Sequence, residues 1–221
     1  MTDKLYSDIV QVYLHEKNVF NSVSECFKLL MTEAENLISD YNKNFEDSNV
    51  DFSINIVHDH IFELTVGSDV IVFFLHPNIF EFSRNHEVMR TKYIQDDKKR
   101  AQCGTILIYN YLADSIKYRR SGDIGYLIGR ILINNEKHFY TEGKKEIGML
   151  LNRFENNLFD KDAAVNILKS SIEYVIHFAL LVPDFDIYKE MSVDQFLQMR
   201  DHMQIKTAKR LGFRFQADKK E

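Results

Sequence analysis

The sequence predicts an α+β fold: a mostly antiparallel six-stranded sheet, in two three-stranded segments, packed by N-terminal and C-terminal helices. Three observations predict it. Residues 103–142 contain β-branched and aromatic runs separated by short turn-forming segments, which is a strong hairpin signal. Residues 52–66 alternate between apolar and polar side chains, as half-buried strands do. Residues 22–42 instead repeat apolar side chains at the i, i+3, i+4 spacing of a helix.

The N-terminal part is predicted to form two helices, over residues 3–15 and 22–42. The second helix has a start signal, because Ser22 is followed three residues later by Glu25, the spacing of a capping box. Its apolar positions share one face, which needs a partner, and one face of the sheet can supply it. These positions are Val23, Phe27, Leu30, Ala34, Leu37 and Tyr41.

The first sheet segment begins with a predicted hairpin. Its two strands cover residues 52–57 and 61–66, and the His-Asp-His sequence at 58–60 forms the turn between them. The apolar run at 70–75 does not alternate, so we expect a central strand that is covered on both faces. The sheet is then expected to continue beyond Pro77 through Ile79, Phe80 and Phe82.

The second sheet segment is predicted to be three successive strands within residues 103–142. Tight turns are expected at 121–123 (Ser-Gly-Asp) and at 134–136 (Asn-Asn-Glu). Gly125 and Gly129 lie on one face of the middle strand and indicate a bulge, or the close approach of a helix or a ligand. The side chains that we expect to be mostly buried are Phe62, Leu64, Val72, Phe74, Ile106, Ile108, Leu127 and Ile131.

The remaining segments are predicted to be mainly helical. Residues 84–100 are charged and weakly helical, and they connect the two sheet segments. Helices are expected at 144–157, 161–182 and 192–204, with Asp160 or Asp162 capping the middle one and a short strand at 213–215. We expect one domain over residues 1–221, with N-terminal helices in 1–45, the sheet and its connecting helix in 50–143, C-terminal helices in 144–205 and a tail in 206–221.

Composition narrows the class of protein. At 221 residues and 45% hydrophobic, the chain can bury a sizeable core. Its two cysteines have no CxxC spacing, which argues against both a disulfide framework and a zinc site. The first residues do not follow the pattern of a signal peptide, and charged residues interrupt every long apolar stretch. We therefore expect a cytoplasmic protein with no membrane span.

Charge is distributed unevenly along the chain. Residues 1–83 carry 4 basic and 14 acidic side chains, residues 84–120 carry 9 basic and 4 acidic, and residues 121–221 carry 15 of each. The acidic first third and the basic middle can satisfy each other across a subunit contact, which favours a homodimer.

The basic middle holds the candidate anion site. Tyrosines are interleaved with the cations here, and aromatic platforms among cations suit a nucleotide or single-stranded nucleic acid. The alternative is a solvated connector plus a charged hairpin end. The acidic pI of about 5.9 argues against a general nucleic-acid binder. The candidate residues are Lys98, Lys99, Arg100, Lys117, Arg119 and Arg120.

His58 and His60 are the candidate metal ligands. Two histidines separated by one residue in a strand project on the same face, as a chelating pair requires, and His76 or His86 could add further ligands. The alternative interpretation is that polar residues gather in a hairpin turn, which Asp59 itself favours.

Motifs of known chemistry are missing from the sequence: there is no Walker pattern, no GxGxxG, no HExxH and no GxSxG. The leading hypothesis is therefore a non-catalytic cytosolic binding or regulatory module with no cofactor, which engages a protein partner or a small anionic ligand. The first alternative is an enzyme whose active site is dispersed along the sequence. The second is a nucleic-acid-associated factor.

Overall fold

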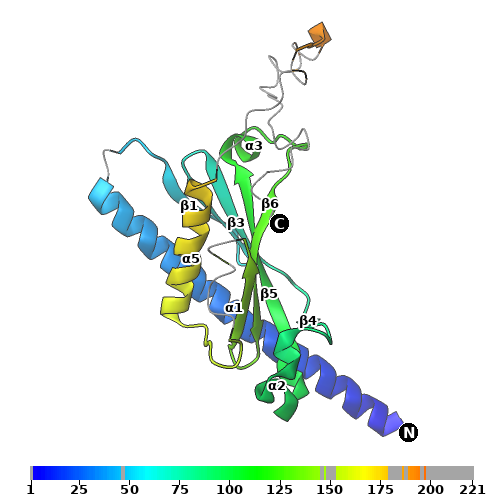
Figure 1. Cartoon of the computed structure of the whole chain (residues 1–221). Coiled ribbons are helices and arrows are strands. Elements are labelled where there is room, and N and C mark those ends of the chain that lie inside the picture. The colour runs from blue at the N-terminus through cyan, green and yellow to red at the C-terminus, as the bar shows by residue number, and fades with distance from the viewer. Residues whose placement is uncertain are drawn as a thin grey trace.

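The computed structural model describes residues 2–45, 48–144, 147, 153–178, 186, 189–194 and 197. It confirms the α+β class, with a seven-stranded antiparallel sheet and helices packed on it (Figure 1). The sheet has the order β1-β2-β3-β5-β6-β7, and β4 pairs with β5 beyond the end of β3. The strands are β1 (Phe52–His58), β2 (Ile61–Val66), β3 (Asp69–Leu75), β4 (Phe80–Glu81), β5 (Gln102–Leu112), β6 (Tyr126–Asn134) and β7 (Phe139–Gly143).

Helices α1 (Thr2–Phe45) and α5 (Lys161–Ile176) pack against the same face of the sheet and contact each other (Figure 1). Their apolar side chains and the inward side chains of β2, β3, β5, β6 and β7 form the main core. Asp160 caps α5, because its carboxylate accepts a hydrogen bond from the Ala163 amide at 2.9 Å. The N-cap prediction is therefore confirmed for Asp160, and the other C-terminal helices predicted lie largely outside the described residues.

α1 is a single 44-residue helix, so the prediction of two helices is wrong. Ser22 does not cap a helix; its hydroxyl instead donates to the backbone oxygen of Asn135 at 3.0 Å. The helix continues through the polar stretch around Asn18 because Val19 is fully buried there and Phe20 is half-buried. Tertiary packing outweighs weak local helix propensity at this point.

The first three strands form as predicted, and the turn between β1 and β2 lies at residues 59 and 60. β3 is central, between β2 and β5, but it is not fully covered on both faces. Ile71 and Phe73 face the helices and are completely buried, whereas Val72 and Phe74 face the other way and are half-buried. Of the predicted core, Phe62, Leu64, Ile106, Ile108 and Ile131 are likewise completely buried.

The connector between the sheet segments covers part of the second face. It forms three short helical turns, η1 (Glu87–Arg90), α2 (Lys92–Asp96) and η2 (Lys98–Ala101), as its weak helical pattern predicts. Its buried side chains pack with outward residues of β5, β6 and β7 in a smaller core. This core contains Phe82, Val88, Ile94, Ala101, Cys103, Leu132, Tyr140 and Phe154.

The first turn predicted within residues 103–142 is not tight. β5 and β6 are joined by residues 113–125, which include the short helix α3 (Ala113–Lys117). The register of this strand pair shifts beside Tyr109, at the bulge that Gly129 predicts, and Leu127 is left 43% exposed instead of buried. A side chain at Gly129 would overlap that of Ile147, so the close approach predicted there is confirmed.

Among the described helices, none combines the length and apolar character needed to cross a membrane.

Candidate interaction surface

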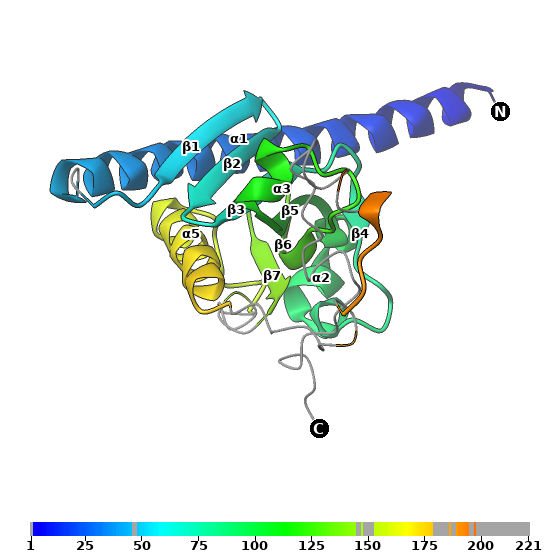
Figure 2. The same cartoon turned by 90° about the horizontal axis from the view of Figure 1, so that it is seen from above.

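The first part of α1 extends beyond the sheet and lies free of the domain (Figure 2). Residues 3–14 are all exposed, and we call residues 2–14 the projecting segment. At about 1.5 Å per residue, it extends roughly 20 Å from the body. Seven of its side chains are large and apolar, which is unusual for a solvated helix. They are Leu5, Tyr6, Ile9, Val10, Val12, Tyr13 and Leu14.

The exposed apolar side chains continue the face that α1 packs on the sheet. Leu5, Ile9 and Val12 are 57%, 44% and 53% exposed, and after one charged position, Glu16, the same side of the helix carries Val19 and Val23, both fully buried. Spacings of three and four residues keep side chains on one side of a helix. The sheet therefore covers only the later part of a longer apolar stripe, and the earlier part is left uncovered by the described residues.

Aromatic side chains follow the edge of this stripe at intervals of seven residues. Tyr6 and Tyr13 are exposed, Phe20 is half-buried and Phe27 is completely buried against Phe62, with ring centroids 5.4 Å apart. An interval of seven is nearly two helical turns, so the four rings line one edge of α1. The pattern is that of a helix that packs along its whole length, yet the body leaves its first residues, with Tyr6 and Tyr13, exposed.

A groove lies where the projecting segment joins the body, and we call it the root groove. It has a volume of about 550 Å³. One wall is α1 and the other is the loop into β4, where the Phe80 ring is 43% exposed and lies 4.9 Å from the ring of His76. The lining residues are Tyr13, Glu16, Lys17, Phe20, Pro77, Asn78, Ile79 and Phe80. The lining combines aromatic and apolar side chains with charged and amide groups, a mixture that suits an amphipathic helix from a partner.

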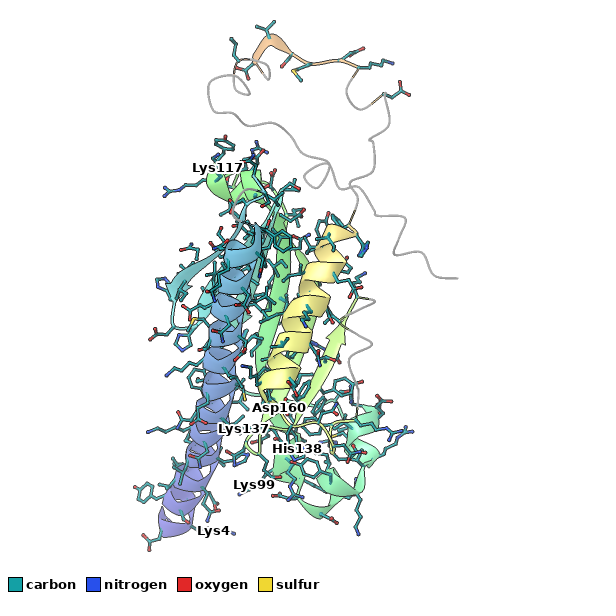
Figure 3. All side chains as sticks on the ribbon, turned by 90° about the vertical axis from the view of Figure 1, so that its left-hand side faces the viewer. Lys4, Lys99, Lys117, Lys137, His138 and Asp160 are labelled. Atoms are coloured by element: carbon teal, nitrogen blue, oxygen red, sulfur yellow. The ribbon has the colours of Figure 1, made fainter. Side chains whose placement is uncertain are left out.

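The six predicted anion-site residues do not converge. Lys98, Lys99 and Arg100 lie in η2 just before β5, and the other three follow β5 in and after α3. An eleven-residue strand spans roughly 35 Å, which separates the two triplets. Figure 3 shows Lys99 and Lys117 at opposite ends of the molecule. The prediction of one six-residue site is therefore corrected to two separate basic triplets.

Arg100, in the first triplet, already has partners within the chain. Its Nε donates to Glu136 at 2.9 Å, and its guanidinium lies 4.4 Å from the centre of the Tyr93 ring. Tyr93 also donates to Glu136 at 2.7 Å and accepts from Asn134 at 2.9 Å. Burial raises the pKa of Tyr93 above its usual range. Burial would also raise the pKa of Glu136, but the hydrogen bonds from Tyr93 and Arg100 outweigh it, so that pKa is lowered.

Arg120, in the second triplet, is buried with few partners. Its side chain is only 4% exposed, and the Asp114 carboxylate, at 4.0 Å, is the one acid paired with it among the described residues. Its Nε has no hydrogen-bond partner. Lys117 and Arg119 are exposed beside it, and the Tyr118 ring lies 5.5 Å from its guanidinium. A buried guanidinium normally uses its five donors, so Arg120 retains capacity for an anion.

Within the part of the chain that the structure describes, His58 and His60 belong to no cluster of metal-ligand side chains. His58 ends β1, and His60 lies in the turn with its ring 5.8 Å from that of Phe20. His76 and His86 each accept a local backbone hydrogen bond through Nδ1. Among the described residues, no three histidine, cysteine or acidic side chains are placed to hold a metal ion. The structure therefore favours the interpretation of the histidine pair as part of a turn.

The two cysteines are structural side chains. Both are buried and free, and burial raises the pKa of Cys26 to about 12 and that of Cys103 higher still. A thiol of this kind carries almost no thiolate at neutral pH and makes a poor nucleophile.

No family model matches the chain, and neither the curated proteins nor the solved structures include a match to it. Function must therefore be argued from the surface itself.

Proposed function

We propose that this chain is a non-catalytic binding module that engages a protein partner through the projecting segment and the root groove. The observation that carries the proposal is the apolar stripe of α1, which is buried from Val19 onward and uncovered before it. Contiguous exposed apolar surface of this kind marks interaction sites in folded proteins. A helix presenting apolar side chains beside a groove is also a recurrent mode of protein recognition.

A paired substitution tests this proposal. Ile9→Glu with Tyr13→Glu places two charges on the exposed stripe, and Gln11→Glu places one charge on the opposite side of the same helix turn. In native extract, the parent chain and Gln11→Glu are expected to migrate in an assembly larger than 26.1 kDa. The double variant is expected to migrate as a free chain, because charges in an apolar interface weaken binding at least about 100-fold.

The thermal unfolding of the purified variants separates binding from folding. Ile9 and Tyr13 are exposed, so their replacement should leave the melting temperature of the body within a few degrees of the parent value. If all three proteins migrate alike in extract, the stripe is not a binding surface and the proposal fails.

Arg120 favours a second candidate function, the binding of a small anion. An incoming phosphate or carboxylate would replace Asp114 as the partner of the guanidinium. Arg120→Gln is then expected to abolish inorganic phosphate binding at low salt, and Asp114→Asn to strengthen it. Lys99→Gln, in the other triplet, should change nothing. Calorimetric titration measures all four proteins, and identical binding by the parent and Arg120→Gln would contradict this candidate.

A further inference from the structure

We infer that the partner of the projecting segment is a second copy of this chain, paired antiparallel with the first about a two-fold axis. This inference rests on the proposed function and names the partner. A two-fold contact uses the same surface on both copies. A surface that carries both an exposed helix and a groove can therefore bind a second copy, with the helix of each copy in the groove of the other. In this arrangement each projecting segment lies along the other, and each free end reaches the root groove of its partner.

The length of the projecting segment fits this arrangement. Two antiparallel helices that cross near Val10 bring the first turn of one helix beside the residues around Lys17 of the other. Lys17 and Glu16 line the root groove, together with Phe20. The free end of one copy therefore arrives at the groove of the other without any rearrangement of the body.

The charges on α1 select the antiparallel direction. Asp3 and Lys17 are separated by close to four turns at about 3.6 residues a turn, so they lie on the same side of the helix. Both are exposed. Antiparallel pairing places Asp3 of each copy beside Lys17 of the other, twice per dimer. Parallel pairing would place Asp3 beside Asp3 and Lys17 beside Lys17, which opposes like charges.

The charge balance of the whole chain points the same way. Within the described residues, no ion pair joins an acidic side chain of residues 1–83 to a basic one of residues 84–120. The basic connector that contains α2 lies at the end of the body from which α1 projects (Figure 1). Asp3, in the first turn of an incoming copy, would bring an acidic group to this end.

A charge exchange tests the pairing in purified full-length protein. The parent is expected to sediment as a dimer, twice the chain mass of 26.1 kDa, at micromolar concentration. Asp3→Lys and Lys17→Asp should each weaken the dimer about tenfold, because each puts like charges together at two symmetric places. The two changes combined should restore the affinity to within about threefold of the parent. A dimer that the combined change does not restore would overturn the antiparallel pairing.

Cysteine cross-linking gives a second readout of the same geometry. The two native cysteines are buried, so an added surface thiol can be addressed selectively. Ile9→Cys lies on the apolar stripe beside the crossing point of the helices, and a short bifunctional thiol reagent is expected to join two copies through it. Gln11→Cys, on the opposite side of the helix, should remain largely uncrosslinked. Equal yields from both variants would contradict the inference.

The two proposals fail separately. A purified parent protein that sediments at 26.1 kDa overturns the second copy as partner. If the same chain still migrates in a larger assembly in extract, and Ile9→Glu with Tyr13→Glu abolishes that assembly, the binding surface stands and the partner is a different protein.

Discussion

Truncation of Phe73 to alanine is expected to lower the free energy of unfolding by about 3–5 kcal/mol. Phe73 is completely buried in the main core, and its ring stacks on that of Phe62 with centroids 4.6 Å apart. Removing it leaves a cavity between β3 and the helices that cover this face of the sheet, and packed neighbours relax only in part to fill such a space. Urea denaturation of the parent and the variant measures the difference.

Phe74 provides the matched control, because it is the next residue on the same strand and faces the other side of the sheet. It is only half-buried, so Phe74→Ala should cost less than half as much as Phe73→Ala. If both substitutions lowered the free energy of unfolding equally, the second face of the sheet would have to be covered in solution. This pair of variants therefore measures how unequally the two sheet faces are packed.

Phe73 and Phe74 also show how much the alternation of apolar and polar residues can predict about this sheet. The patterns in β2 and β3 identify the strands, their order along the chain and the apolar positions. In a strand that is apolar throughout, such as β3, the patterns do not indicate which face the helices cover. For this reason the sequence places Val72 and Phe74 in the core together with Ile106, although both are only half-buried. That information comes from tertiary packing, because α1 and α5 cover only one face.

The sequence contains a signal for the interaction surface, but the prediction of two separate helices, with a loop between residues 15 and 22, hides it. The interval of seven residues between Tyr6, Tyr13, Phe20 and Phe27 runs through the region expected to be a loop. Taken as one helix, these residues share an edge from end to end. Which part of that edge is uncovered depends on where the sheet ends, and no local pattern contains that information.

The basic residues could be identified from the sequence but not grouped. Arg100 and Lys117 are close in sequence, yet β5 runs fully extended between them and carries them apart. The partners that decide their roles are also distant, since Glu136 comes from the β6–β7 turn. The burial of Arg120 likewise follows from the path of residues 113–125, where the sequence predicts a tight turn at 121–123 only.

The contact of α1 with the sheet leads to the second large expected effect. Gly104 lies in β5 directly beneath α1, and a methyl group added there would lie 2.5 Å from the Val23 Cγ1 and 3.0 Å from its Cβ. Both atoms belong to a stiff, fully buried side chain that cannot turn away. Gly104→Ala should therefore lower the free energy of unfolding by about 1–3 kcal/mol, although alanine normally suits a strand better than glycine.

A double-mutant cycle shows whether steric overlap is the cause. Val23→Ala alone removes buried methyl groups and should also be destabilising. In the double variant the new methyl group of Gly104→Ala occupies the space that Val23→Ala vacates, so the combined loss should be smaller than the sum by about 1 kcal/mol or more. Additive losses would mean that α1 does not lie this close to β5. Since the buried half of α1 holds the projecting segment in place, loosening this contact should also weaken any assembly formed through that segment.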